Sequence, residues 1–443
     1  MKKSIIIVLL LFGVLAQSQN KQWTLKECVD YALENNISVK QSELDILTSE
    51  LNKRDAIGNF LPTLNASSRL SWSIGLNQDP VTFNAVNSTT RTLSGGISSS
   101  VDIYRGLSNV NQLRRSNLQL LSSQYQLDNM KDNISLNVAN AFVQVLFNKE
   151  QLKVALAQQE VTKQDINRTQ ELVDAGSLPR GDLYEIQATL ASQEQQVVNA
   201  ENAILLSKIS LAQLLLLKDY ENFDIEEFKY DVPLANILNE TPRSIFEKAR
   251  EARYDIKIAE NNNEIAEYDL KIAKASLQPS LTGGYSFSSN YFTSELFDTP
   301  NFENQISDNK NHNFFLSLNI PIFNGFSVKN NVKRSKVSLE LSKFQLEQTE
   351  LDLETNVYQS FNDAKGALKA YEAAQKTLIA RQEAFNYSQE RYTVGLLNSF
   401  DFNQSKNNLE SAQSEVVRTK YDYIFKLKVL EFYFGIPVTE SKL

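Results

Sequence analysis

The stretch ELVDAGSLPRGDLYEIQA, residues 171–188, interrupts a long run of polar, helix-forming sequence with two glycines and a proline. Gly176 suits the C-terminal end of a helix, where a residue with positive φ is needed. Pro179 and Asp182 suit the first turn of a following helix, because the N–H that proline lacks is unbonded there and a carboxylate meets the positive end of the helix dipole. The stretch therefore predicts the tip of a hairpin made of two helices.

The same layout returns in RYTVGLLNSFDFNQSK, residues 391–406. Gly395 and Asp401 each lie 219 residues after their counterparts in the first stretch. Upstream, Pro62-Thr63-Leu64 recurs as Pro279-Ser280-Leu281, which lies 217 residues later. We therefore expect an internal duplication of two halves of about 220 residues each.

Composition narrows the class of protein. Charged residues make up 22% of the 443 residues, mean hydropathy is −0.34 and only 14 residues are glycine. These values favour long helices over an α/β enzyme fold. The net charge is −8 and no basic cluster with interleaved aromatic residues occurs, which excludes nucleic acid as a partner class. Residues 1–18 have the pattern of a secretory signal peptide, with Lys2 and Lys3 before an apolar run and a small-residue cleavage site.

Cysteine and histidine, which often form catalytic or metal-binding sites, occur only once each. Cys28 has no second cysteine with which to form a disulfide, and we expect a small apolar residue, half-buried on a helix. His312 has no cysteine or second histidine for a metal site, and no Ser/His/Asp nucleophile can be assembled around it. No glycine-rich phosphate loop precedes a helix. The sequence therefore predicts no enzyme activity, no metal site and no cofactor.

Four segments alternate apolar with small polar residues, at 64–74, 93–103, 281–291 and 314–320. A period of two over about ten residues predicts strands with one apolar face. A soluble β-sandwich would show the same alternation, but the strand length and the aromatic residues near the strand ends favour strands that span a membrane. The residues expected to face lipid are Leu70, Trp72, Ile97, Tyr285, Phe287, Leu316 and Leu318.

Four strands from one chain cannot close a membrane barrel, because open edges would leave backbone groups unpaired in lipid. Two copies would give eight strands and a barrel filled by its own side chains, whereas three would give twelve strands and a channel. The small polar residues on the inner face favour a water-filled channel. We therefore expect three copies to share one 12-stranded barrel.

The remaining sequence has a helical period. Between Val357 and Tyr392, apolar or core-compatible residues recur in steps of four and three, at Phe361, Ala364, Leu368, Tyr371, Gln375, Leu378, Gln382 and Phe385. The returning arm of the first hairpin has such residues at Leu183, Ile186, Leu190, Val197, Ile204 and Leu211. A period of 3.5 predicts left-handed coiled-coil packing. A helix from about residue 107 to 175 would be on the order of 100 Å long.

In this order, and repeated, these features resemble the TolC-like outer membrane efflux protein family (outer membrane factors) over essentially the whole mature chain. The most specific motifs are Leu61–Leu64 with its counterpart Gln278–Leu281, the strand exit Pro321–Phe326, and the tip Arg391–Gly395 followed by Asp401. The resemblance implies a homotrimer in outer membrane lipid, with a 12-stranded barrel continuous with a periplasmic α-helical barrel. It further implies a passive exit duct of a tripartite efflux or type I secretion system, opened by an inner-membrane pump and its periplasmic adaptor.

The resemblance also assigns roles to residues at the two tips. Asp401 matches the first acidic residue of the aperture motif, and Asp182 is its counterpart in the first hairpin. Gln404 stands where some members hold a second acid, and we expect Tyr392 and Phe400 to pack the closed aperture. Alternatively, Asp401 serves only the dipole of its own helix. The residues expected to dock the adaptor are Gly176, Ser177, Leu178, Pro179, Arg180, Gly181, Val394, Gly395, Leu396, Leu397, Asn398 and Ser399.

The expected division of the chain follows. Residues 1–18 are the signal peptide, 19–60 and 242–277 are the N-terminal helices of the repeats, 61–105 and 278–323 are β-hairpins, 106–217 and 324–435 are long helical hairpins, and 436–443 are a tail. Residues 218–241 and Trp23-Thr24-Leu25 are expected to be non-helical and to pack as a belt around the tube. The alternative function is a periplasmic coiled-coil adaptor or scaffolding protein without a membrane barrel.

Overall fold

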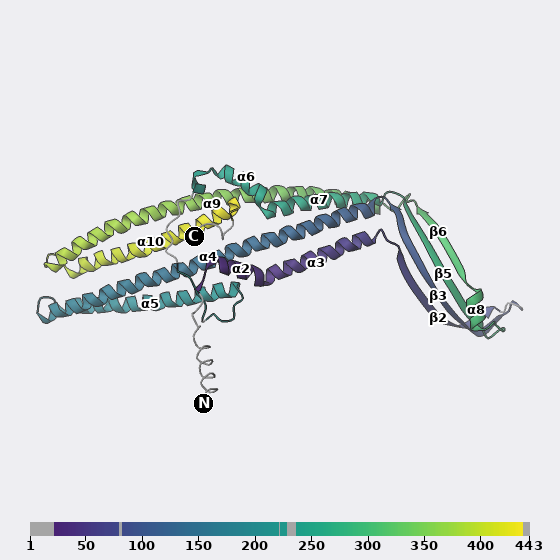
Figure 1. Cartoon of the computed structure of the whole chain (residues 1–443), viewed down its shortest axis with the longest axis horizontal. Coiled ribbons are helices and arrows are strands. Elements are labelled where there is room, and N and C mark those ends of the chain that lie inside the picture. The colour runs from purple at the N-terminus through teal and green to yellow at the C-terminus, as the bar shows by residue number, and fades with distance from the viewer. Residues whose placement is uncertain (1–21, 79–81, 221, 228–235, 437–443) are drawn as a thin grey trace, which may run out of the picture. The chain divides into compact units, whose positions relative to one another are not determined.

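The computed structural model describes residues 22–78, 82–220, 222–227 and 236–436. The expected signal peptide, and all but the first residue of the expected tail, lie outside these ranges. Long helices dominate the described chain, and four longer strands form one sheet (Figure 1). This confirms the predicted fold class, mainly α with a β segment of four strands per chain. Among the described helices, none has both the length and the apolar character needed to cross a lipid bilayer.

The chain forms two compact units, each assembled from separate parts of the sequence. One contains the residues up to Glu43, Gln126–Ile256 and everything from Gln348 onward. The other contains Leu44–Tyr125 and Lys257–Glu347. Each unit takes residues from both sequence repeats, so we call the first the hairpin unit and the second the sheet unit.

The sheet unit holds an antiparallel sheet in the order β2 (Thr63–Gln78), β3 (Ala85–Arg105), β5 (Ser280–Ser294) and β6 (Asn311–Asn319). The strands β2, β3 and β5 cover the first three segments with alternating apolar and polar residues, and β6 covers the fourth except Ile320, which follows the strand. A β-bulge between Asp102 and Tyr104 shifts the register of β3 near its end. Within one chain, β2 and β6 each have a free edge, because each pairs with a single neighbour.

A short helix, α8 (Phe302–Asp308), lies between β5 and β6 and was not predicted from the sequence. It begins at Asn301, whose side chain accepts a hydrogen bond from the N–H of Asn304. Gln305 of α8 accepts a hydrogen bond from the Phe292 N–H and donates one to the Phe292 carbonyl, each 2.9 Å long. The buried Gln305 side chain therefore holds α8 against β5, where β6 no longer covers the strand.

Helices of the sheet unit connect to the strands through sharp turns. These helices are the greater part of α3 (Ile37–Gly58), almost all of α7 (Tyr254–Ala275), and the first parts of α4 (Ser108–Asp174) and α9 (Ser327–Thr393). Gly106 before α4 and Gly325 before α9 both have φ of +61°. A Cβ atom at Gly106 would lie 2.5 Å from the Ala275 carbonyl oxygen, so only glycine fits there. The turn occurs in both repeats, which indicates that the duplication copied the strand-to-helix junction.

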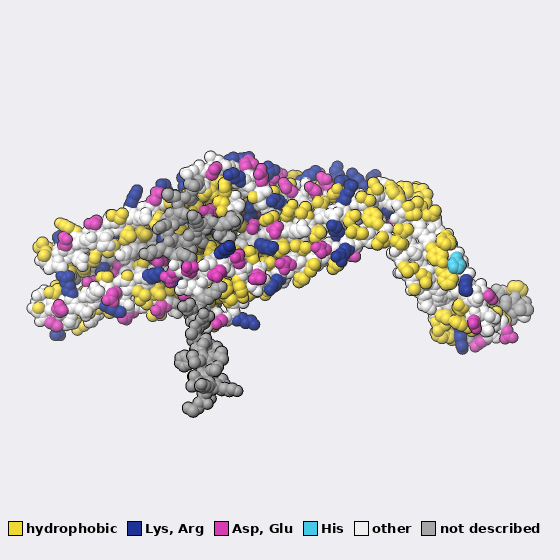
Figure 2. Space-filling view, viewed as in Figure 1, with side chains coloured by type: hydrophobic (Ala, Val, Ile, Leu, Met, Phe, Trp, Pro, Cys, Tyr) yellow, Lys and Arg dark blue, Asp and Glu magenta, His cyan; other side chains and the backbone are white. Residues whose placement is uncertain are grey.

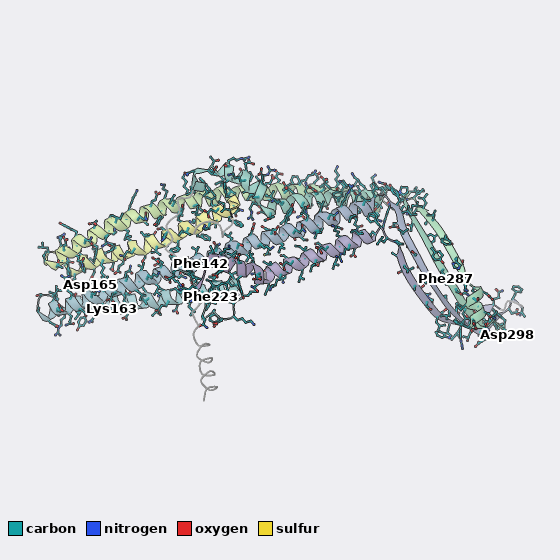
Figure 3. All side chains as sticks on the ribbon, in the orientation of Figure 1. Phe142, Lys163, Asp165, Phe223, Phe287 and Asp298 are labelled. Atoms are coloured by element: carbon teal, nitrogen blue, oxygen red, sulfur yellow. The ribbon has the colours of Figure 1, made fainter. Side chains whose placement is uncertain are left out.

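The hairpin unit contains the remainder of α4 and α9, together with α2 (Leu25–Asn35), α5 (Arg180–Leu214), α6 (Pro242–Ala252) and α10 (Ser399–Phe434). Its core includes fully buried side chains such as Phe142, Leu211 and Tyr423, and Figure 3 labels Phe142 and Phe223 within it. Cys28 also lies in this core and is fully buried, so it is more enclosed than the half-buried residue that we expected.

The coiled-coil seam follows the predicted period with small shifts. Val357, Phe361, Ala364 and Phe385 of α9 are buried. Gln375 is exposed, however, and its neighbour Ala374 is buried instead. In the returning helix α5 the buried positions include Leu183, Ile186, Val197 and Leu211, with the polar Gln193 at the intervening step. The seam therefore tolerates polar side chains where a partner helix can bond them.

The two segments expected to be non-helical meet in the structure. Trp23 lies in β1 (Gln22–Trp23), which pairs in parallel with β4 (Asp224–Ile225). Thr24 is not part of a strand but caps α2, and Leu25 is the first residue of that helix, so the prediction of non-helical structure is wrong for Leu25. A short 3-10 helix, η1 (Asn236–Asn239), precedes α6, so the prediction of non-helical structure is also wrong for these four residues.

Candidate functional site

The sheet has two faces of opposite chemistry. Its register places Leu70 opposite Leu93, and Leu93 opposite Tyr291, so these side chains share one face. The same pairing brings all seven residues that we expected to face lipid to that face, which we call the apolar face. Leu70, Trp72, Ile97, Leu316 and Leu318 are between 45% and 72% exposed. Figure 2 shows hydrophobic side chains gathered over the strands, and Figure 3 labels Phe287 among them. Such a large exposed apolar surface marks a contact with lipid or protein.

The opposite face, which we call the polar face, consists mostly of serine, threonine and asparagine. A typical row runs from Asn65 through Ser98 and Ser286 to Asn313. The aromatic ring of Phe315 is an exception, and it lies over Gly284, where a Cβ atom would clash with it. The small polar side chains that predominate make most of this face wettable.

His312 lies on the apolar face opposite Phe287. Its Nδ1 atom lies 2.9 Å from the hydroxyl oxygen of Tyr285, and its ring packs 5.0 Å from the Phe287 ring centroid. Within the described ranges, no cluster of three or more His, Cys, Asp and Glu side chains could hold a metal ion. The histidine therefore belongs to an aromatic cluster on the sheet surface.

Both hairpin tips close with the same backbone geometry. Gly176 has φ of +70°, its N–H donates to the Val173 carbonyl, and the Ser177 N–H donates to the Leu172 carbonyl. Gly395 has φ of +74°, its N–H donates to the Tyr392 carbonyl, and the Leu396 N–H donates to the Arg391 carbonyl. This is the Schellman arrangement, in which a left-handed residue lets the last helical carbonyls find donors.

The two tips differ at the start of the second helix. In the first tip the residue before α5 is Pro179, which has no side-chain cap, so this proline precedes the helix instead of lying in its first turn. In the second tip the Asn398 side chain accepts a hydrogen bond from the Asp401 N–H at 2.8 Å and donates one to the Asp401 carboxylate at 2.9 Å. Asp401 is exposed and Asp182 half-exposed, each in the first turn of its helix.

Aromatic packing behind the second tip differs from the expectation. Phe400 is 75% exposed, so in one chain it does not pack the tip. Phe402 takes that place instead: its ring stacks on Tyr392 at 4.4 Å and lies 5.7 Å from Phe385. Burial raises the pKa of Tyr392, and the negative charges of Asp182 and Asp165 nearby raise it further. The heptad register identifies Phe402, because it lies one heptad, seven residues, before the seam residue Leu409 and Phe400 does not.

A buried lysine joins the two hairpins behind the tips. Lys406 of α10 is 5% exposed, and its Nζ donates to the Asp165 carboxylate at 2.6 Å and to the Thr162 hydroxyl at 2.9 Å, both on α4. Figure 3 labels Asp165 near the end of its hairpin. This pair was not predicted from the sequence. A signal was present, because Lys406 lies four residues after Phe402 and three before Leu409, which is a core position of the heptad.

Further along α10, polar side chains continue the contact. Gln193 of α5 donates a hydrogen bond to the Glu410 carboxylate at 3.1 Å, and Gln158 of α4 donates to the Glu410 carbonyl. Burial raises the pKa of Glu410, although the positive charge of Lys406 opposes the rise. We call the set Thr162, Asp165, Gln193, Lys406 and Glu410 the polar seam. It connects the first hairpin to the second through hydrogen bonds and an ion pair between polar side chains.

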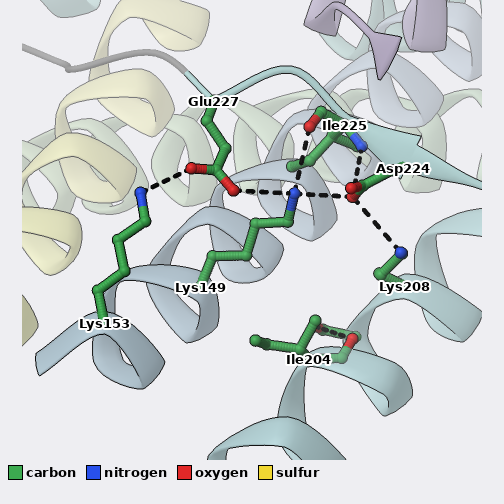
Figure 4. A network of polar contacts seen from close by, with 8 residues as sticks. Lys149, Lys153, Ile204, Lys208, Asp224, Ile225 and Glu227 are labelled. Atoms are coloured by element: carbon green, nitrogen blue, oxygen red, sulfur yellow. Dashed lines mark hydrogen bonds and ion pairs between the residues drawn. The ribbon is translucent and has the colours of Figure 1, made fainter. Parts of the chain in front are cut away.

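A second ionic network fixes the segment around β4 to the long helices (Figure 4). Lys149 of α4 contacts Asp224 at 2.7 Å and Glu227 at 3.3 Å, while Lys208 of α5 contacts Asp224 at 3.4 Å. Lys153 pairs with Glu227 at 2.6 Å. Burial alone would raise the pKa of Asp224, but the hydrogen bond and charge of Lys149, together with the Ile225 N–H and the charge of Lys208, outweigh it and lower the pKa. The expected belt segment is thus held by lysines of both arms of the first hairpin.

Comparison with known proteins identifies a family and several proteins that are similar to this chain. A family model described as "Outer membrane efflux protein" matches residues 28–215 and 245–435, one stretch in each repeat. Outer membrane protein TolC of Salmonella enteritidis is 21% identical over 96% of this chain and 83% of its own length. The cation efflux system protein CusC of Escherichia coli O157:H7 is 23% identical over 81% of this chain and 72% of its own.

Solved structures give the same result for the fold. A CusC crystal structure matches with a TM-score of 0.80 at 17% identity, covering 95% of both chains. The outer membrane protein VceC of Vibrio cholerae matches with a TM-score of 0.79 at 15% identity, covering 93% of this chain and 96% of that one. Since the family model matches most of the sequence in two repeats, and the fold agrees, this chain belongs to the outer membrane efflux protein family.

Proposed function

We propose that three copies of this chain form a passive exit duct across the outer membrane, which carries cargo outward from the periplasm. The observation that carries the proposal is the antiparallel sheet with one exposed apolar face, one small polar face and two free edges. In lipid, free edges would leave N–H and C=O groups unpaired, so the sheets of several copies must join. Membership of the family supports a channel in the outer membrane that extends into the periplasm, and not an enzyme.

The strand directions favour closure by identical copies. The four strands alternate in direction, so β6 of one copy and β2 of the next would be antiparallel, like every other pair in the sheet. Three copies give twelve strands, enough for a water-filled lumen lined by the polar face. The apolar face then contacts lipid.

The hairpin tips supply the second half of the proposal. Their Gly176 and Gly395 turns would dock a periplasmic adaptor, and an inner-membrane pump would supply energy and select cargo. The ends of six hairpins would meet in a trimer, with three copies of Asp401 at the narrowest point and Gln404 one turn further along. The similarity to relatives named for TolC and for cation efflux supports this assembly without naming the cargo.

A pair of charge substitutions tests the orientation of the sheet. Leu70 and Ser71 are neighbours in the middle of β2, on the apolar and polar faces respectively, and both are exposed in the single chain. Leu70→Arg should cost about 2–4 kcal/mol if that face lies in lipid near mid-membrane. Ser71→Arg should be tolerated, because the neighbouring Arg69 already carries a charge on the polar face.

The readout is the yield of heat-stable trimer from the detergent-solubilised outer membrane fraction. We expect Leu70→Arg to reduce it strongly and Ser71→Arg to leave it near the wild-type level. Equal yields would overturn the assignment of the two faces. Recovery of the wild-type protein as a monomer from the soluble periplasm would overturn the channel altogether and favour a soluble coiled-coil protein.

A further inference from the structure

The polar face of the sheet carries an arginine, Arg69, that has no partner among the residues that the structure describes. By the strand register, its charged residues are Arg69, Asp102 and, beyond the bulge, Arg105. Asp102 accepts hydrogen bonds from Arg105 at 3.3 Å and from the Thr282 hydroxyl at 3.2 Å. No hydrogen bond or ion pair joins Arg69 to another described residue. Asp102 lies eight residues along β3 from the partner of Arg69, about 26 Å at 3.3 Å per residue, too far to neutralise it across water.

Arg69 borders a groove built for polar ligands. The groove has a volume of about 430 Å³ and is lined by Ser67, Arg69, Ser94, Ser98, Ser286 and Ser288, among others. Gly96 lies opposite Ser67, so no side chain fills the floor of the groove at that row. Serine hydroxyls donate hydrogen bonds, and no carboxylate lines the groove. Its chemistry therefore suits a negatively charged group.

The duplication shows that the strand does not need this arginine. Residue 69 lies seven positions after Pro62, and its counterpart seven positions after Pro279 is Ser286. Both residues face the same side of the sheet, where the neighbouring positions are Ser67 and Ser71 in the first repeat and Gly284 and Ser288 in the second. A charged residue in place of serine in only one repeat is a feature of the lumen surface and not of the strand pattern.

We propose that Arg69 and the surrounding serine hydroxyls form an oxyanion-binding position inside the β part of the duct, for carboxylate, sulfonate or phosphate groups of the cargo. This rests on the proposed channel, in which three copies of Arg69 surround one lumen. Guanidinium binds oxyanions through two parallel N–H donors, and hydroxyls complete the contact. Three weak positions facing one lumen reinforce each other for a ligand with several anionic groups.

The test uses the purified full-length protein in planar bilayers, with benzene-1,3,5-tricarboxylate as the probe on the side of the strands. In wild type we expect transient blocks of the current, weakened at high salt by screening. Arg69→Ser, which installs the residue of the second repeat, should raise the blocking concentration at least tenfold. Arg69→Lys should give an intermediate blocking concentration, because lysine keeps the positive charge but cannot form the bidentate hydrogen bonds of arginine. Arg91→Ser is the control, since Arg91 pairs with Trp72 on the apolar face.

Inorganic phosphate and benzenesulfonate, tested in the same way, separate the three oxyanion classes. Conducting wild-type channels without block, or equal block of wild type and Arg69→Ser, would overturn the site while leaving the proposed channel intact. A lower melting temperature of the Arg69→Ser trimer with unchanged block would assign Arg69 to a contact between copies instead. If the wild type forms no channels at all, the proposed function and this site fail together.

Discussion

The two long hairpins share a backbone and differ in what their side chains do. Gly176 and Gly395 close both tips with the same left-handed turn and the same pair of hydrogen bonds. Behind the turn, the first hairpin has Val173 and Leu183 where the second has the stacked rings of Tyr392 and Phe402. The difference indicates that the two copies share the geometry of the hairpin, while the packing behind the tip has diverged between them.

The polar contacts follow the same division. Lys406 and Asp165 form a buried ion pair between the hairpins. Their counterparts 219 residues away, Gln187 and Ala384, are both exposed and form no such pair. The ion pair between the two hairpins therefore has no counterpart at the equivalent positions. This difference lets substitutions distinguish the two hairpins in experiment, although their backbones match.

The largest expected effect comes from the aromatic stack of the second tip. Phe402→Ala removes a side chain that is 4% exposed and leaves Tyr392 and Phe385 without their common neighbour. We expect a loss of about 4 kcal/mol in local stability, within the range for buried phenylalanine. Hydrogen exchange of amides 385–410 in the detergent-solubilised protein measures it.

Two further variants compare the loss from Phe402→Ala with the first hairpin and with the exposed neighbour Phe400. Leu183→Ala, at the counterpart position of the first tip, should cost about 2–3 kcal/mol in hydrogen exchange of the corresponding amides 166–191. Phe400→Ala should change stability by less than about 0.5 kcal/mol, because its side chain is exposed. If Phe400→Ala loosens the tip as much as Phe402→Ala, then Phe400 is buried by another copy and the original expectation for it was correct.

The next effect concerns the polar seam. Lys406→Met removes the positive charge and leaves Asp165 beside an apolar side chain, which should destabilise the contact between α4 and α10 by about 3 kcal/mol. The melting temperature of the purified protein, followed by helix circular dichroism, reports the loss. Adding Asp165→Leu to Lys406→Met should restore most of the stability, since no unpaired charge then remains.

Gln187→Met, at the counterpart position in the first hairpin, is the matched control and should leave the melting temperature almost unchanged. A double variant that is no more stable than Lys406→Met would show that Asp165 is not the partner that matters. Apolar packing around these positions, and not the ion pair, would then hold α4 against α10.

Several parts of this fold were predictable from the sequence because they rest on periodicity. The strands follow from alternation in segments such as 64–74, and the tips follow from glycine and proline at fixed offsets. The pairing of β3 with β5 could not be read from the sequence, because it joins strands from different repeats. Helix α8 was missed because its seven residues are too few to show a helical period.

At the tips, prediction was limited by contacts that depend on side chains from distant segments. The heptad pattern marks position 406 as a core step, yet nothing local reveals that Asp165, 241 residues earlier, lies within 2.6 Å. The choice between Phe400 and Phe402 has a different origin, because the predicted seam ended at Tyr392 and was not continued into the returning helix, where Phe402 lies one heptad before Leu409. A tertiary contact therefore decides position 406, whereas the period of the sequence identifies position 402.

The smallest effect tests whether Asp401 has a role beyond its helix. Asp401→Ala removes the acceptor for the Asn398 amide and a carboxylate at the N-terminus of α10, so we expect a loss of about 1 kcal/mol. Asp182→Ala removes only a carboxylate near the dipole of α5 and should cost about 0.5 kcal/mol. Hydrogen exchange at the two tips compares these losses within one protein.

Ion selectivity separates capping from a role at the aperture. In the proposed trimer three Asp401 carboxylates surround one opening, so they attract cations and repel each other. Asp401→Asn keeps an acceptor for Asn398 and loses the charge, so it should preserve tip stability while lowering the cation preference of single channels in planar bilayers. Asp182→Asn should lower that preference less, because it lies in the other hairpin. If Asp401→Asn leaves selectivity unchanged and only Asp401→Ala loosens the tip, the aspartate is a helix cap, and the narrowest point of the duct lies elsewhere along the hairpins.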